Sequence, residues 1–114
     1  MHVMQLIQSA LVSTGIATYQ AKYFADGEAK AHPDPYLVYQ VYTYEDRHLD
    51  DQMTEFRHDI YISLYGSGDL SAAILAVRDA MYGIGYSMRE ERTDAEFDTR
   101  DYAVHWSWTG REMR

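Results

Sequence analysis

This sequence of 114 amino acids contains no cysteine. The side chains that could bind a metal or transfer a proton are therefore chiefly its five histidines and eighteen acidic residues. Without cysteine, disulfides, thiolate-bound zinc and a cysteine nucleophile are excluded. No two histidines have the three- or four-residue spacing that places two imidazoles on one helix face. We therefore interpret them as single surface or core residues. They are His2, His32, His48, His58 and His105.

The carboxylates and glycines do not form a recognisable ligand site either. The acidic run over residues 45–51 lacks the ligand spacing, central glycine and terminal glutamate of an EF-hand. Gly66 and Gly68 are followed by Asp69 rather than by a lysine, so the phosphate-loop pattern is missing and the aspartate would repel an anion. Asp69 and Ser67 instead suit the capping of a following helix. We expect no metal site and no cofactor.

Nucleophilic and acid–base catalysis have equally little support. No serine lies in a G-x-S-x-G turn. Asp59 and Asp101 are acids in the middle of strand-like segments, and pairing with Arg57 or Arg100 is their expected role. We assign no catalytic residue and expect a protein that is not an enzyme.

Hydrophobic periodicity predicts the elements that position these residues, within a single domain over residues 1–114. The order is a helix, a short strand, a long hairpin, a second helix and a second hairpin. This order predicts an α+β fold, with a mostly antiparallel sheet of four or five strands and two helices packed on one face. The predicted helices cover about residues 2–14 and 69–82, and the strands lie within 16–24, 36–44, 55–65, 86–92 and 98–109.

The strand over residues 36–44 has aromatic and β-branched residues on both faces, which is typical of a strand that is covered on two sides. One cover would be the helices, and the other a neighbouring subunit. The candidate subunit-interface residues are Tyr36, Val38, Val41, Tyr42 and Tyr44.

The formal net charge of −8 lies in two segments, residues 45–55 and 90–101, each with a net charge of −4. Such a charge argues against a protein that grips phosphate backbones. The two segments are predicted hairpin tips that point to opposite ends of the sheet, and they either are solvated loops or face a passage or a partner. The candidate tip residues are Glu45, Asp46, Asp50, Asp51, Glu55, Glu90, Glu91, Asp94 and Glu96.

Several stretches together resemble the tail terminator, or tail-completion, proteins of long-tailed bacteriophages and prophages. They are an amphipathic helix (LIQSALVSTG), a Pro-Tyr-aliphatic strand (PDPYLVYQVY) and an alternating strand that ends in a small turn (FRHDIYISLYGSGDLS). A helix that closes in a glycine before an aromatic (AVRDAMYGIGYSM) and a final aromatic strand (DTRDYAVHWSW) follow. The resemblance covers nearly the whole chain.

This resemblance implies a non-enzymatic minor tail protein of the virion, present in the host cytoplasm during assembly. Proteins of this family form homo-oligomeric rings, commonly hexamers, that cap the tail tube and contact the head connector or stopper protein. The acidic tips would let DNA pass without specific binding. The alternatives are a connector adaptor or stopper, and an acidic inhibitor or DNA mimic. We expect no membrane partner, since no apolar run approaches the roughly 20 residues of a bilayer span.

Overall fold

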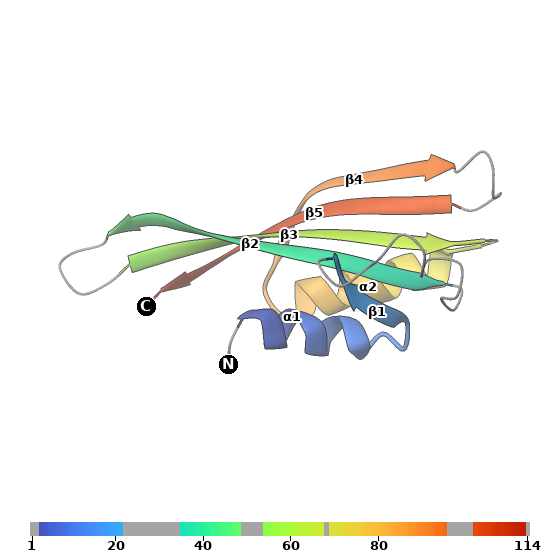
Figure 1. Ribbon diagram of the computed structural model, residues 1–114, viewed down its shortest axis with the longest axis horizontal. Coiled ribbons are helices and arrows are strands. Elements are labelled where there is room, and N and C mark those ends of the chain that lie inside the picture. Colours follow the sequence, from blue (N-terminus) through green and yellow to red (C-terminus); the bar gives the residue numbers. More distant parts are fainter. Residues whose placement is uncertain (1–2, 22–34, 49–53, 68, 96–101, 114) are drawn as a thin grey trace.

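The computed structural model describes residues 3–21, 35–48, 54–67, 69–95 and 102–113. The elements found there have the predicted types and order, and confirm the α+β fold (Figure 1). The helices are α1 (Val3–Val12) and α2 (Ser71–Gly83), and the strands are β1 (Ala17–Gln20), β2 (Tyr36–His48), β3 (Thr54–Gly66), β4 (Ser87–Ala95) and β5 (Tyr102–Met113).

Local sequence signals explain where the two helices begin and end. The Asp69 carboxylate accepts hydrogen bonds from the backbone amide (2.9 Å) and the hydroxyl (2.6 Å) of Ser71, the first residue of α2. These bonds lower the pKa of Asp69, because they favour its charged form. Gly15 and Gly85 follow the two helices with φ angles of 80° and 89°, a backbone conformation that glycine adopts without a Cβ clash.

The strands form one mixed sheet in the order β1-β2-β3-β5-β4. β2, β3, β5 and β4 pair antiparallel, as expected for two hairpins. The short strand β1 pairs parallel with the start of β2, and the sequence did not predict this pairing. Parallel pairing needs a connection of about a dozen residues or more, and the number of residues between β1 and β2 meets this requirement.

One face of the sheet packs on both helices, and we call it the helix face (Figure 1). The rows Leu37–Leu64–Val104 and Tyr39–Ile62–Trp106 cross three strands on this face. They pack with buried residues of the helices, such as Ile7 and Leu11 of α1 and Val77 and Met81 of α2. The alternate residues of each strand point to the opposite side, which no helix of the described chain covers and which we call the open face.

The molecule is elongated. Its radius of gyration is 15.4 Å, whereas a compact domain of this size has about 13 Å. β2 and β3, with thirteen residues each, extend about 40 Å, but α1 and α2 are only about 15 and 20 Å long. The β2–β3 hairpin therefore projects beyond the helices, toward the left in Figure 1.

Candidate functional site

Tyrosines gather on the open face because β2 and β3 carry them at alternate positions. Tyr36 of β2 stacks on Tyr65 of β3, with ring centroids 5.2 Å apart and planes at 24°. Further along the hairpin, Tyr42 meets Tyr61 edge-on at 5.7 Å. Tyr42, Tyr44 and Tyr61 are 45%, 44% and 42% exposed, which is high for aromatic rings. We call these three residues the tyrosine patch, and a ring with a polar tip suits such a contact surface.

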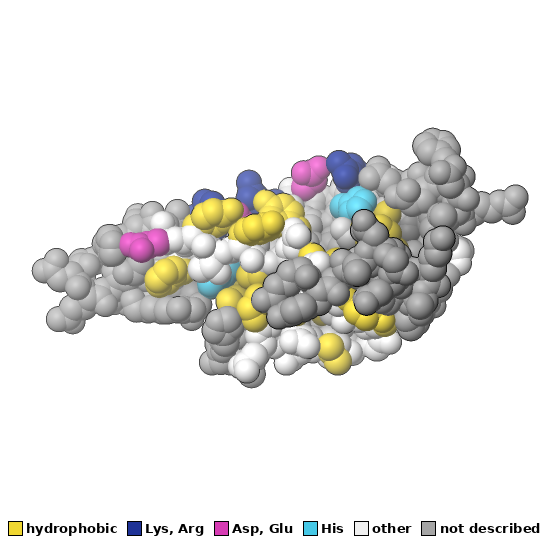
Figure 2. All heavy atoms as spheres, in the orientation of Figure 1, with side chains coloured by type: hydrophobic (Ala, Val, Ile, Leu, Met, Phe, Trp, Pro, Cys, Tyr) yellow, Lys and Arg dark blue, Asp and Glu magenta, His cyan; other side chains and the backbone are white. Residues whose placement is uncertain are grey.

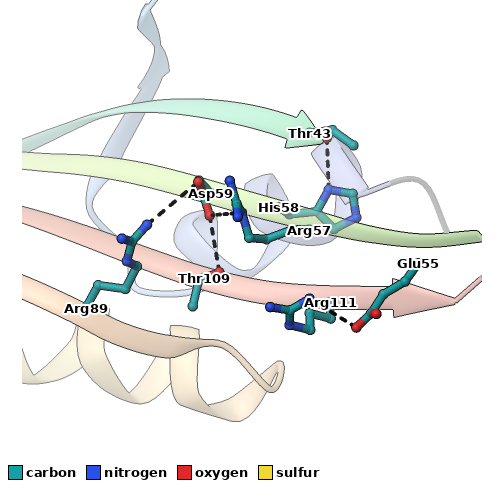
Figure 3. A network of polar contacts seen from close by, with 8 residues as sticks. All are labelled: Thr43, Glu55, Arg57, His58, Asp59, Arg89, Thr109 and Arg111. Atoms are coloured by element: carbon teal, nitrogen blue, oxygen red, sulfur yellow. Dashed lines mark hydrogen bonds and ion pairs between the residues drawn. The ribbon is translucent and has the colours of Figure 1, made fainter. Parts of the chain in front are cut away.

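A polar cluster around Asp59 adjoins the tyrosine patch and ties three strands together (Figure 3). Although Asp59 is only 3% exposed, its carboxylate lies 3.3 Å from Nε of Arg57 and 3.8 Å from a guanidinium nitrogen of Arg89. The Thr109 hydroxyl donates a hydrogen bond of 3.2 Å to the same carboxylate. These contacts offset the cost of burying a charge.

The same cluster places a cation beside an exposed ring. The guanidinium carbon of Arg57 lies 4.8 Å from the centre of the Tyr44 ring, within cation–π range. Asp59 pairs with Arg57, as expected, but along β3 and not across strands as predicted, whereas Arg100 and Asp101 lie outside the described residues. In Figure 2, basic side chains adjoin exposed hydrophobic ones over the left half of the molecule.

Two further polar contacts lie nearer the Glu55 end of β3 (Figure 3). Arg111 of β5 donates to the Glu55 carboxylate at 3.1 Å, and the Glu55 side chain is only 12% exposed. On the helix face, the Thr43 hydroxyl and Nδ1 of the buried His58 are 2.8 Å apart. His58 is therefore a hydrogen-bonded core histidine, as interpreted from the sequence, and His105 likewise bonds Ser63 at 2.8 Å.

The candidate interface residues do not all lie on one surface. Tyr36, Val38, Tyr42 and Tyr44 lie on the open face, at alternate positions of β2. Val41 points to the helix face, where it is partly buried against the core. An odd-numbered spacing along a strand separates residues onto opposite faces, so Val41 and the four others cannot share a contact.

The described strand ends that flank the two acidic segments lie at opposite ends of the sheet, in agreement with the prediction. β2 and β3 connect beside the end of β5, where Glu55 pairs with Met113, whereas β4 and β5 connect beside the end of β3, where Tyr102 pairs with Gly66. Glu45 and Glu90 are exposed. The side chains of Asp46 and Asp94, and all of Asp50, Asp51 and Glu96, lie outside the described residues.

Glu91 is not a solvated tip residue, because it lies on β4 against α2. Arg78 of α2 forms two hydrogen bonds with its carboxylate, and the Trp106 indole nitrogen donates a third at 2.6 Å. The Arg78 bonds foremost, and the Trp106 bond in addition, hold the pKa of Glu91 below its ordinary value although burial opposes this. Glu55 and Glu91 thus form ion pairs within the chain, with Arg111 and Arg78.

The described residues offer contact chemistry on the open face. No three histidine or acidic side chains converge on one point within the described ranges. Neither α1 nor α2 is long and apolar enough to cross a bilayer. What the arrangement provides is aromatic stacking, cation–π contact and hydrogen bonding across an exposed sheet.

Tyr61 and the Arg57–Asp59–Arg89 cluster belong to this surface, although they were not predicted from the sequence as parts of it. Their signal was available in part, because the alternation of residues 55–65 places Arg57, Asp59 and Tyr61 on the face opposite the apolar residues. That Arg89 of β4 reaches the same cluster depends on β5 lying between β3 and β4, which periodicity does not reveal.

No protein-family model matches the sequence, and a search of curated proteins finds no match. Among solved structures, the chain is similar to one described as the virion of a native gene transfer agent particle, with a TM-score of 0.67 and 15% identity. That likeness covers 96% of this chain and 92% of the other. A structure from Akkermansia muciniphila, of a protein without its transmembrane region, gives a TM-score of 0.41 at 15% identity over 68% and 44% of the two chains, too weak to carry an argument. The chain thus shares its whole fold with a virion protein.

Proposed function

We propose that this chain is a structural component of a phage-like virion, and specifically a ring-forming tail terminator that caps the tail tube and joins it to the head connector. The observation that carries the proposal is the fold shared with a chain of a gene transfer agent virion over nearly the full length of both. A likeness of this extent concerns the whole domain and not one motif. The sequence stretches that resemble tail terminators also extend over nearly the whole chain.

The open face supports a role in assembly. A sheet that packs helices on one face and exposes aromatic rings on the other has a surface suited to a protein neighbour. Tyr36, Val38, Tyr42 and Tyr44 would lie at the contact between subunits, with Tyr61 added from β3. A head-to-tail contact between identical subunits generates a ring when the rotation closes. The resemblance to tail terminators implies that this ring is a hexamer.

The acidic charge suits a ring through which DNA slides, because like charge keeps phosphates from sticking. Glu45 is exposed near one end of the sheet, Glu90 is exposed level with Tyr61 in its middle, and both are available for such a lining. Asp50, Asp51 and Glu96 are proposed for the same role on sequence alone. The passing DNA would meet repulsion and no specific contact.

A DNA mimic receives less support from the same charges. Such a protein must present carboxylates to a basic partner, but Glu55, Asp59 and Glu91 are all bound to arginines of this chain. A connector adaptor or stopper remains a role in the same assembly, and the phenotype of a deletion separates it from a terminator.

The test is deletion of the gene from the phage or prophage that encodes it, followed by electron microscopy of the lysate. A terminator predicts overlong tails and unjoined heads, both restored by the wild-type gene supplied in trans. Tails of normal length with unjoined heads would identify an adaptor or stopper instead, and normal particles would refute a virion role.

The subunit surface is tested in the same assay with two variants that remove apolar area. Tyr42→Ser on the open face should fail to restore tail length, whereas Leu75→Ser, at a position of α2 that is 55% exposed against 45% for Tyr42, should restore it. Full restoration by Tyr42→Ser would exclude Tyr42 from the contact.

A further inference from the structure

Among the described residues, a strand pairs with the outer edge of β2 over only part of its length. β1 pairs with β2 from Tyr36 to Tyr39 and then ends. From Gln40 to Tyr44, β2 pairs with β3 on one side and has no strand of the described chain on the other. This segment carries neither proline nor lysine, which are residues that commonly block pairing at an exposed edge. We call it the free edge of β2.

The other edge of the sheet is β4, whose character differs. It carries Arg89, Glu90, Glu91 and Arg92 in succession, with an irregular register between Met88 and Glu90. Charged side chains and bulges oppose unselective pairing at an edge strand, so a partner of β4 must suit its charges and its register. The free edge of β2 offers tyrosines instead, and a tyrosine ring accepts an arginine over its face.

We infer that the free edge of β2 receives β4 of the next copy in antiparallel pairing, so that the sheet continues from subunit to subunit. This inference rests on the ring of the proposed function and names an edge contact for it, to which Tyr42 and Tyr44 belong. Tyr36 and Val38 lie where β1 covers the edge and are outside this contact. The interaction is strand addition, in which main-chain hydrogen bonds hold the partner and alternate side chains select it.

The strand directions inside one subunit fit this contact. β2 is antiparallel to β3, β3 to β5 and β5 to β4, so β2 and β4 run in opposite directions. Rotation about an axis along the strands keeps these directions, and therefore brings β4 of one copy beside β2 of the next in antiparallel orientation. The two edges differ, so the contact is head-to-tail and can close into a ring.

The side-chain alternation selects a register. For the open faces of two copies to be continuous, residues of β4 that point to the open face must lie opposite Tyr42 and Tyr44 of β2. Glu90 and Arg92 meet this condition, since they pair with Ser107 and His105 on the open face of β5. With Glu90 opposite Tyr44 and Arg92 opposite Tyr42, Asp94 lies opposite Gln40 and β4 fills the free edge. Ala95, the last residue of β4, would then meet the position of Tyr39 that β1 already pairs, so it must turn away from the edge.

This register demands a stagger that closed sheets can accommodate. Within one subunit Glu90 lies level with Gln40, through Ser107 and Tyr61, so placing it opposite Tyr44 shifts the copies by four residues. Four residues span about 13 Å, and the four strands β2, β3, β5 and β4 span about 19 Å across. The ratio corresponds to a strand tilt of about 35°, which lies within the range of closed barrels.

The absence of cysteine from the chain makes the contact testable by cross-linking. The double variant Tyr44→Cys/Glu90→Cys, supplied in trans to a deletion host, is treated with a short bismaleimide in purified particles and in concentrated protein. Within one subunit the two positions are separated by three strand spacings and four residues, about 19 Å, so a short linker joins them only between copies. The controls are each single variant and Tyr44→Cys/Leu75→Cys, whose second cysteine lies on α2.

The inference predicts a ladder of cross-linked species that ends at a closed oligomer, from the Tyr44→Cys/Glu90→Cys variant alone. Dimers from the single Tyr44→Cys variant would overturn it in favour of two-fold pairing between β2 strands. Particles that contain the chain but give no ladder would overturn the edge contact and leave the virion role standing. Absence of the chain from particles would refute the proposed function itself.

Discussion

Trp106 and Trp108 form a matched pair for measuring one buried hydrogen bond. They lie two residues apart on β5, face the helices and are 2% and 0% exposed. Nε1 of Trp106 donates to the Glu91 carboxylate at 2.6 Å, whereas Nε1 of Trp108 is buried with no hydrogen-bond partner in the described chain. Replacing either one by phenylalanine removes the same atoms, but only the replacement of Trp106 also removes a hydrogen bond.

The expected difference follows from the state of each indole nitrogen. Trp106→Phe loses a hydrogen bond to a charged group, which is worth about 1.5–3 kcal/mol. The low end applies because the Glu91 side chain is 26% exposed and keeps its hydrogen bonds to Arg78. Trp108→Phe removes an unsatisfied buried donor, which offsets part of the packing loss that both variants share. We expect Trp106→Phe to lower the free energy of unfolding by at least about 2 kcal/mol more than Trp108→Phe.

Urea unfolding followed by fluorescence measures this difference, because each variant retains one of the two tryptophans. In thermal unfolding the same difference corresponds to a melting temperature about 8 °C lower for Trp106→Phe. Equal stabilities of the two variants, or a less stable Trp108→Phe, would refute the assignment of the Trp106–Glu91 hydrogen bond as a stabilising contact.

Three further predictions concern other contacts. Because the pKa of Glu91 is lowered in the folded state, its contribution is present above the ordinary glutamate pKa of about 4.3 and is lost as the pH falls through the lowered value. The stability advantage of the wild type over Glu91→Gln should thus shrink on acidification in pH-dependent urea unfolding, and a constant difference would contradict the ion pair. Gly110→Ala places a Cβ 3.0–3.1 Å from three ring atoms of Tyr86 and should cost about 1–3 kcal/mol in the same assay; no change would show that the ring moves freely. The double variant Asp50→Lys/Asp51→Lys should still form tails but should impair DNA ejection, because lysines attract the phosphates. Unchanged infectivity would show that these two residues play no part in DNA passage.

The sequence predicted the elements well because each carries its own periodicity and stop signals. The predicted bounds lie within a few residues of the observed ones. The signals were the apolar helical spacing that ends before Gly15, the alternation of residues 55–65 and the turn at Asp69. These signals are local, so they need no knowledge of which strands are neighbours.

The partners of the side chains were harder to predict, because they depend on strand order and register. Glu55 and Glu91 are acidic in the sequence, but the register brings Arg111 beside one, and the packing of α2 brings Arg78 beside the other. Val41 was grouped with Tyr42 because strand 36–44 is apolar on both faces, although the pleat separates these two residues. The pairing of β1 with β2 also left no local signal, and it decides where the free edge begins.

The position of the chain in the particle tests the account most directly. Particles are purified from a lysate in which the deletion is complemented by a copy carrying an epitope tag, the copies per particle are quantified by mass spectrometry, and the tag is located by immunogold electron microscopy. A ring-forming tail terminator predicts a fixed small number of copies, six for a hexamer, at the junction of head and tail. Label along the whole tail, or particles that lack the chain, would contradict it.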